Sequence, residues 1–331
     1  MQHADSFRTF LRDTVNLSQR RLDLLAARVE TIYQALKNDP DLGPLILGKK
    51  PQGSWAQRTI INPQSGKEFD ADFMLHLTEV PDWSDSPKTY IDKTYAALDR
   101  HPIYRDMPHT RKCRCVQLRY ANSMHVDIVP YLHLADGREA IVNRDDNTWE
   151  QTNPAGFTAW MQRQDKIANG NLRKVIRLMK FLRDHKDSFT GTRSIILTTL
   201  LGNRISQFQA MARPGCYANI PTALLTIVED LDTWLQARPL KPSIPDPSGS
   251  GVTFDHRWNQ QTYAYFRERI HTHARQIHEA YHETDPDRSI RLWRNLFGEA
   301  FPAPQARITP AAAKFATPAL LTTVSRTGRA G

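Results

Sequence analysis

The sequence predicts an α/β (α+β) protein of two lobes, with a mixed β-sheet in the first half and helices in the second. Three observations support this class. Strand-like alternation of apolar residues occurs within the first 150 residues, and helical apolar spacing follows from Trp149 onward. The chain has 331 residues, more than most single domains, and 40% of them are apolar, which is sufficient for a large core.

The chain is expected to begin with a long amphipathic helix. Apolar residues recur at helical spacing from Asp5 to Leu36, with one break near Ser18, and the pair Asp39-Pro40 ends the pattern. We therefore assign residues 1–40 to an N-terminal helix that spans the two lobes.

Residues 41–150 are predicted to form a strand-rich core. The pair Gly53-Ser54 precedes WAQRTII, and because serine is a favourable N-cap, a helix is expected to begin there. The run FDADFMLHL (69–77) has the pattern of a strand. The runs CVQLRY (115–120) and MHVDIVPYLHL (124–134) are separated by a turn-like Ala-Asn-Ser and predict a hairpin.

Residues 151–300 are predicted to form a helical lobe. Helical spacing covers five segments: 171–186, 194–208, 219–237, 254–282 and 289–298. The apolar stripe of the first segment indicates packing in a core, and its members are Val175, Ile176, Leu178, Met179 and Leu182. Residues 301–331 are rich in Ala, Thr and Pro without an amphipathic face, so a disordered tail is expected.

Three acidic residues stand out because they lie in apolar strands. Asp70 and Asp72 are two apart in FDADFMLHL and therefore share one face of the strand, and Asp127 lies in MHVDIVPYL. Carboxylates on one apolar face repel one another and raise each other's pKa unless a cation compensates them. If the two strands are neighbours, the three carboxylates converge, which is the arrangement for two divalent ions with oxygen ligands.

The Gly53-Ser54 pair adds a second feature of the same chemistry. Free backbone N–H groups at a helix start, a serine hydroxyl and a glycine that permits close approach suit a triphosphate. Two metal ions about 3.5–4 Å apart can activate an attacking hydroxyl and neutralise a leaving pyrophosphate. We expect Mg²⁺ in this role, with Mn²⁺ as a substitute.

The order GSWAQRT, then D-A-D in an apolar strand, then HVDIVP resembles the signature of polymerase-β-like nucleotidyltransferases. In its details the chain is similar to the bacterial cGAS/DncV-like nucleotidyltransferases (CD-NTases) of CBASS antiphage operons. The likeness extends to the basic helix KVIRLMKFLRDHK, the segment RSIILTTLL and the Pro-rich connector before FDHRW, and covers roughly Phe7 to Phe297. It implies a nucleotidyltransferase core with a C-terminal helical lobe.

The resemblance also implies roles for particular residues. Gly53 and Ser54 would hold the donor triphosphate, with Lys180 and Ser194 as further phosphate contacts. Asp70, Asp72 and Asp127 would bind the metals, and we expect Asp127 to be the general base because it faces the acceptor. A solvated helix lysine is the equally weighted alternative for Lys180.

Two positions depart from the family pattern. Arg58 stands where the family often has Gly, and Ile195 stands where relatives can place an aromatic residue that stacks on a base. The surface that holds the base is therefore left unassigned.

The implied activity is the joining of nucleoside triphosphates into a cyclic di- or trinucleotide that contains adenine, with release of pyrophosphate, as a second messenger in antiphage defence. The expected partners are the nucleotide substrates and an operon-encoded protein, either a ubiquitin-ligase-like enzyme acting on Gly331 or a HORMA-type activator. We expect neither a membrane nor a stable nucleic acid as partner.

Charge and cysteine content indicate the cellular compartment in which the chain is expected to act. The net charge is +9, of which the tail from Phe301 contributes four basic residues and no acid, so the body carries only a modest basic excess. Three cysteines and an N-terminus without the pattern of a signal peptide favour a reducing, cytoplasmic setting. Cys113 and Cys115 are expected on one strand face as buried thiols, since nothing nearby completes a zinc site.

Three alternatives remain open from sequence. A template-independent nucleotidyltransferase acting on RNA or protein would use the same chemistry, and a catalytically silent nucleotide sensor would keep only the fold. The string HEAYH (278–282) matches the HExxH motif of zinc proteases. Its helix, which also carries His271 and His273, is strongly polar, so we expect a solvated face there instead.

Overall fold

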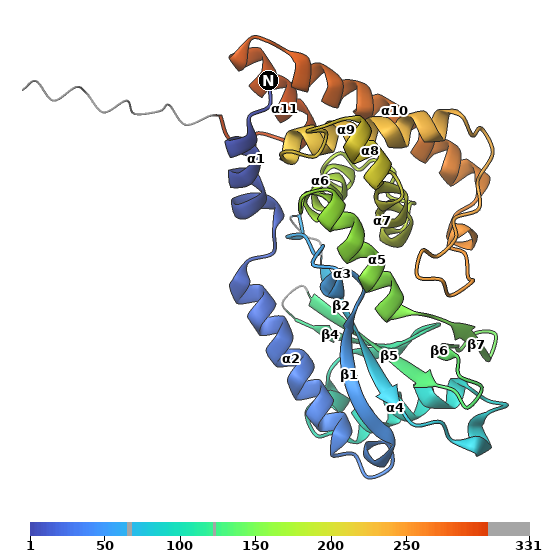
Figure 1. Ribbon diagram of the computed structural model, residues 1–331. Coiled ribbons are helices and arrows are strands. Elements are labelled where there is room, and N and C mark those ends of the chain that lie inside the picture. The colour runs from blue at the N-terminus through green and yellow to red at the C-terminus, as the bar shows by residue number, and fades with distance from the viewer. Residues whose placement is uncertain (65–67, 122–123, 304–331) are drawn as a thin grey trace, which may run out of the picture.

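The computed structural model describes residues 1–64, 68–121 and 124–303, and these form a sheet-bearing lobe below a helical lobe (Figure 1). Of the predicted tail 301–331, residues 304–331 with Gly331 lie outside the described residues. The predicted start at 301 was wrong, because Phe301 is fully buried and packs on Phe7. The α/β class with a mixed sheet and a C-terminal helical region is confirmed. The boundaries that we assigned to the lobes stay a prediction.

One mixed sheet organises the lower lobe. Its order is β1-β2-β5-β4-β3, and β6 pairs with β5 and with β7. Only the β2–β5 pairing is parallel; the predicted β4–β5 hairpin is present and antiparallel. The described strands are β1 Ile46–Gln52, β2 Phe69–Leu77, β3 His109–Arg111, β4 Val116–Tyr120, β5 Met124–His133, β6 Glu139–Asn143 and β7 Thr148–Gln151.

Helices cover the sheet and build the upper lobe (Figure 1). The described α-helices of the sheet lobe and the N-terminal segment are α1 Ala4–Phe10, α2 Gln19–Lys37, α3 Gly53–Ala56 and α4 Lys88–Arg100. Those of the helical lobe are α5 Pro154–Ile167, α6 Leu172–His185, α7 Ser194–Gly202, α8 Gln207–Ala212, α9 Ile220–Gln236, α10 Gln260–His282 and α11 Pro286–Phe297.

The N-terminal segment is two helices joined by a π-helical turn and a short extended stretch. The turn is Leu11–Val15, and the break lies near Ser18, whose side chain accepts a hydrogen bond from the Arg21 N–H and caps α2. The segment contributes to two apolar cores. Its buried residues from Phe7 to Val15 belong to the helical-lobe core, and Leu17 and the buried residues of α2 belong to the sheet-lobe core.

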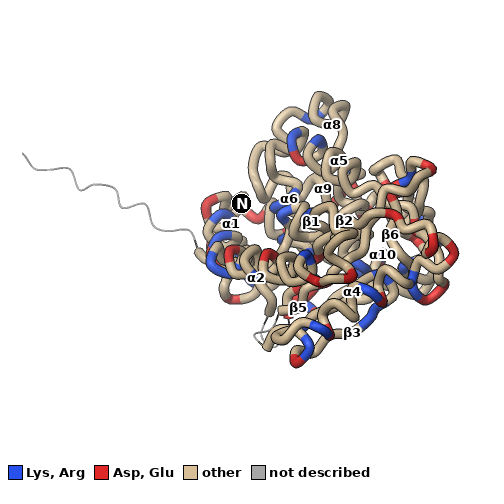
Figure 2. Tube along the Cα trace, turned by 90° about the horizontal axis from the view of Figure 1, so that it is seen from below, with Lys and Arg blue, Asp and Glu red and all other residues tan. Residues whose placement is uncertain are grey.

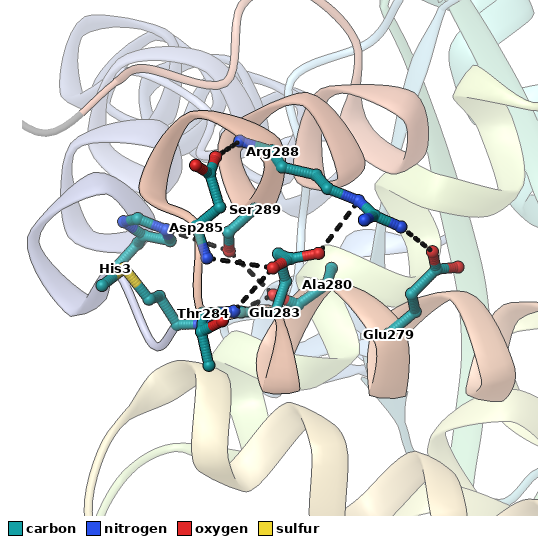
Figure 3. Close-up of polar contacts among 9 residues, drawn as sticks. His3, Glu279, Ala280, Glu283, Thr284, Asp285, Arg288 and Ser289 are labelled. Atoms are coloured by element: carbon teal, nitrogen blue, oxygen red, sulfur yellow. Dashed lines mark hydrogen bonds and ion pairs between the residues drawn. The ribbon is translucent and has the colours of Figure 1, made fainter.

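The start of the chain is held by the turn between α10 and α11. The His3 ring and the Ser289 hydroxyl are 3.0 Å apart, and the same hydroxyl donates to the carbonyl oxygen of Ala280 (Figure 3). Asp285 caps α11 by accepting from the Arg288 N–H. Nearby, the rings of Phe7 and Trp293 pack edge to face at 4.9 Å. The first residues of the chain and helix α11, which are far apart in the sequence, therefore pack together in one core.

The apolar stripe predicted on α6 is fully buried at all five positions, as expected for a core face. Trp293 and Trp258 are buried helix-packing anchors, whereas Trp234 is partly exposed. The prediction for Cys113 and Cys115 was wrong in its geometry. Both residues precede β4 in a bend, so only Cys115 is buried, and Cys113 is half-buried.

Candidate active site

The parallel pairing of β2 with β5 brings the acidic residues together. Asp72 lies directly opposite Asp127 in the register, and Asp70 stands two residues earlier on the same face of β2. All three line one cavity of about 1140 Å³. Asp70 is exposed, while Asp72 and Asp127 are partly buried. The convergence that the sequence predicted from two separate strands is thus present.

The electrostatics of the group reflect this crowding. Burial, reinforced by Asp70 and Asp127, raises the pKa of Asp72 to about 7. Burial also raises the pKa of Asp127, although the Gln117 amide donates to its Oδ1 at 3.0 Å and opposes the shift. Adjacent carboxylates cannot all ionise cheaply without a cation, and their oxygens are ligands that hard divalent ions prefer. The donor set therefore fits a divalent metal.

The backbone of Gly53 lies close against one of these carboxylates, that of Asp72. It begins α3 with φ +58°, and a Cβ atom there would lie 2.2 Å from Oδ2 of Asp72. Only glycine satisfies both conditions without a shift of the carboxylate. The turn after β1 and the acidic strand β2 are consequently in direct contact at this residue.

Our prediction that Ser54 caps a helix through WAQRTII was wrong. Gln52 occupies the N-cap position and α3 is a single turn, so Ser54 lies within that turn. The turn ends because Arg58 has φ +56° and the Thr59 N–H donates to the carbonyl oxygen of Ser54. Arg58 thus adopts the left-handed conformation that favours glycine.

Lys180 is a buried residue of α6, so the alternative of a solvated lysine was wrong. Its Nζ donates to the carbonyl oxygen of Thr59 at 2.9 Å. Burial lowers the pKa of Lys180 to about 8, an effect that nearby Asp70 opposes. Ser194 begins α7 and accepts a hydrogen bond from Arg183 Nη1 at 3.3 Å. Every site residue named from sequence lines the one cavity: Gly53, Ser54, Asp70, Asp72, Asp127, Lys180 and Ser194.

Several residues of the site escaped the sequence analysis, one behind Asp127 and three in the cavity lining. Gln117 lies opposite Asp127 in the β4–β5 hairpin, and the hairpin register could have identified it. Arg114, Arg193 and Arg257 come from three separate loops or turns that only the fold brings to the cavity. No periodicity or spacing in the sequence marks them as neighbours.

The HExxH string does not form a metal centre. His278 contacts Glu229 at 2.6 Å, and Glu279 lies toward Arg288 on the exposed side of α10 (Figure 3). Within residues 1–64, 68–121 and 124–303, no three His, Cys, Asp or Glu side chains form a ready-made metal cage, and this holds for the three aspartates of β2 and β5 as well as for the HExxH helix. His273 on the same helix corrects our expectation of a solvated face, because it is only 1% exposed.

Fold and site together define a nucleotidyltransferase of the polymerase-β type: a mixed sheet with acidic residues on adjacent strands, a Gly-Ser turn against them and a helical lobe. Residues 1–165 match the Second Messenger Oligonucleotide or Dinucleotide Synthetase (SMODS) domain. The chain belongs to the bacterial cGAS/DncV-like nucleotidyltransferases, the CD-NTases.

Individual relatives match the chain at low identity and over different shares of its length. The cyclic AMP-AMP-AMP synthase of Acinetobacter sp. is 23% identical over 82% of this chain and 78% of its own length. The c-di-GMP synthase of Roseivirga ehrenbergii is 29% identical, over 45% of this chain and 40% of that protein. The structure of Vibrio cholerae DncV with bound 3′-deoxy ATP shares the fold, with a TM-score of 0.73 and 14% identity over 91% of this chain and 96% of that one.

Escherichia coli CdnC, solved with ATP, shares the same fold with a TM-score of 0.68. It is 17% identical over 90% of this chain and 98% of that chain. Nucleotidyltransferases generally use divalent metal ions, in agreement with the donor set on β2 and β5. Among the described residues, no helix is long and apolar enough to cross a membrane.

Proposed function

We propose that this chain joins nucleoside triphosphates, including ATP, into a cyclic di- or trinucleotide second messenger and acts in antiphage defence in the cytoplasm. The observation that carries the proposal is the register that sets Asp72 beside Asp127, with Asp70 on the same face and Gly53 against them. The matched relatives support it, since their names are those of cyclic AMP-AMP-AMP and c-di-GMP synthases.

The chemistry would be an in-line displacement. A ribose hydroxyl of the acceptor nucleotide attacks the α-phosphorus of the donor, a new phosphodiester bond forms, and the α–β bond breaks to release pyrophosphate. Asp127 takes the proton of that hydroxyl, because burial raises its pKa and makes its carboxylate more basic. The Gln117 amide holds the Asp127 carboxylate in its orientation through the bond to Oδ1.

Asp70, Asp72 and Asp127 would hold two Mg²⁺ ions, for which Mn²⁺ could substitute. When bound, such ions neutralise phosphate charge and lower the pKa of the attacking hydroxyl. The raised pKa of Asp72 supports this assignment, because nearby cationic charge is what a buried carboxylate beside two others requires.

The donor triphosphate would lie over the turn at Gly53 and Ser54. Lys180 and Ser194 reach the same cavity from α6 and α7 and would contact its phosphates. The Lys180 ammonium donates one hydrogen bond to the carbonyl oxygen of Thr59. Its two other N–H groups can donate to phosphate oxygens.

A protein partner is also proposed. E. coli CdnC, which shares the fold, has been solved in a complex with a HORMA protein, and this supports a HORMA-type activator. A ubiquitin-ligase-like enzyme that attaches the chain through Gly331 is the second candidate partner, and that residue lies outside the described part of the chain.

The test is incubation of the purified protein with all four ribonucleotides and Mg²⁺ or Mn²⁺, followed by phosphatase treatment and mass spectrometry. We expect phosphatase-resistant cyclic products that an Asp70→Asn/Asp72→Asn variant does not make. Linear products alone would favour the template-independent polymerase. In the view of Figure 2, basic and acidic residues are interspersed along the described chain.

A further inference from the structure

The turn that begins with Gly53 and Ser54 lies where the two lobes meet (Figure 1). On the sheet side, Gly53 lies against Asp72 of β2. Two backbone hydrogen bonds close the turn: the Gln57 N–H donates to the carbonyl oxygen of Gly53 at 3.1 Å, and the Thr59 N–H donates to that of Ser54 at 2.8 Å. A group that holds residues 57–59, at the far end of the turn, therefore also holds the residues proposed to bind the donor triphosphate.

Helix α6 presents three cationic side chains to that far end. They lie at positions 173, 177 and 180, a spacing that places them on one face of the helix. They donate to three successive carbonyl oxygens: Arg173 Nε to Gln57 at 2.9 Å, Arg177 Nη1 to Arg58 at 3.4 Å and Lys180 Nζ to Thr59 at 2.9 Å. The last carbonyls of a helical turn have no partner inside it, and charged donors make strong hydrogen bonds to them.

Arg173 is itself held in place by Asp165 of α5. Its Nη1 donates to Oδ2 of Asp165 at 2.6 Å, and its backbone N–H donates to Oδ1 at 3.1 Å. The side chains of the pair are only 19% and 12% exposed. Because the guanidinium is planar and one edge is fixed by Asp165, the direction in which Nε points toward Gln57 is fixed as well.

Arg173 contacts the turn and not the cavity. Lys180 lines the cavity, whereas Arg173 and Asp165 are not among the described residues that do so. Gln57, which accepts from Arg173, does line it, and the Gln57 side-chain amide donates to the Thr158 hydroxyl of α5 at 3.0 Å. Both α5 and α6 therefore hold the residue at the end of the turn.

We propose that Arg173, oriented by Asp165, is a positioning residue that holds the turn 53–59 in register with Asp72 for binding of the donor triphosphate; this inference rests on the proposed function. The sheet lobe supplies Asp72, the helical lobe supplies Arg173, and the turn lies between them. Because a misplacement of about 1 Å can cost about 100-fold in rate, support from both sides matters for the reaction.

The test uses a reaction limited to one link. A 2′,3′-dideoxynucleoside triphosphate can only donate, and a nucleoside triphosphate with an uncleavable α–β bridge can only accept, so the two KM values are measured separately. Arg173→Met/Asp165→Asn removes the guanidinium without leaving an unpaired carboxylate. We expect its donor KM to rise roughly 10- to 100-fold and its acceptor KM to stay unchanged. General loss of stability would lower the active fraction and leave both KM values alone.

Arg173→Lys should recover part of the loss. An ammonium at this position can still donate to the carbonyl oxygen of Gln57, but it lacks the planar fork that also pairs with Asp165. If the double variant does not fold, Arg173→Lys decides the question, and a donor KM equal to that of wild type would then overturn the assignment.

Hydrogen–deuterium exchange tests the same contact without catalysis. In the double variant, peptides within residues 53–61 should exchange at least about 10-fold faster, because the Gln57 and Thr59 amides are protected only while the turn is closed. Peptides of α10 should be unchanged. A wild-type protein that makes no product but shows this difference would contradict the synthase activity, while the hold of Arg173 on the turn would stand.

The matched control is Arg213→Met/Asp230→Asn. This pair has the same 2.6 Å separation, but it joins the end of α8 to α9, and Asp230 lines a separate cavity of the helical lobe. The control should leave both KM values and the exchange of the turn unchanged. Active Arg173→Met/Asp165→Asn with an unchanged donor KM, or with equal rises in donor and acceptor KM, would overturn the positioning role and leave the synthase activity intact.

Discussion

Gly53 combines a left-handed backbone with a close contact to Asp72 of the acidic strand, and the two effects can be separated. For Gly53→Ala we expect synthesis to fall at least about 100-fold, because the new Cβ lies 2.2 Å from Asp72 Oδ2 and displaces that carboxylate. The positive φ should itself cost about 1 kcal/mol of unfolding free energy. Product assays and chemical denaturation measure the two effects.

Gly137 supplies the matched control for that substitution. It also has a positive φ, +85°, but a Cβ atom there meets open space. Gly137→Ala should therefore lose a similar amount of stability and keep its activity. If Gly53→Ala were as active as Gly137→Ala, the contact with Asp72 would have no part in the chemistry.

At the same scale, the sequence predicted the residues whose chemistry conflicts with their surroundings. Asp70, Asp72 and Asp127 are acids in apolar strands, and that conflict is visible without a structure. Arg257 offers no such conflict, because an arginine in a short polar turn such as Asp255–Arg257 is ordinary. Its unmet hydrogen bond exists only once the connector folds against β7.

At the scale of elements, α10 has the polar composition of an exposed helix and yet buries a histidine. His273 contacts the Ser188 hydroxyl and Gln276, packs on Phe189, and lies near two cations, Arg269 and Lys186. Burial, more than any of these neighbours, lowers the pKa of His273 to about 4. The folded protein therefore holds this ring neutral.

The sign of the pH effect follows from that shift. The unfolded chain binds a proton at His273 near pH 6.5, whereas the folded chain does not until about pH 4. Between these values the unfolded state holds more protons, so stability falls as the pH falls, by about 3 kcal/mol in total. Below pH 4 no further loss comes from this ring.

Urea denaturation at pH 7.5 and at pH 4.5 measures this contribution. In His273→Gln the decrease between the two pH values should shrink by about 2–3 kcal/mol relative to wild type. The control is His271→Gln on the exposed side of α10, where His271 meets Asp232, and it should leave the decrease unchanged. An undiminished decrease in His273→Gln would assign the pH dependence to other groups.

Among the helices and strands, the periodicity of apolar residues predicted correctly those elements that bury one face. The helices α6, α9 and α11 and the strands β2 and β5 follow their patterns closely. The prediction of a helix through WAQRTII after Gly53 was wrong because Arg58 adopts a positive φ, which an arginine in a sequence does not predict. The strand β1 was missed because its sequence, ILGKKPQ, pairs with β2 through backbone bonds while only Ile46 among its residues is buried.

At the scale of the molecule, the N-terminal segment connects the two apolar cores. Phe7 is fully buried against Trp293 and Phe301, with ring centroids 4.9 Å apart in both pairs, and it belongs to the helical-lobe core. Val29 and Ile32 of α2 belong to the sheet-lobe core. Because one continuous segment belongs to both, loss of its anchor in one lobe should be transmitted to the other.

Phe7→Ala tests this coupling. Removal of a fully buried ring should lower the free energy of unfolding by about 3–5 kcal/mol, whereas Phe7→Leu should cost much less because it leaves a smaller cavity. Both lobes should then unfold at the same lowered denaturant concentration. The lobes can be followed separately through tryptophans kept one at a time, Trp149 beside β6 and Trp258 before α10. Two separate transitions, with only the helical lobe shifted by Phe7→Ala, would mean that each core folds independently and that the N-terminal segment merely spans them.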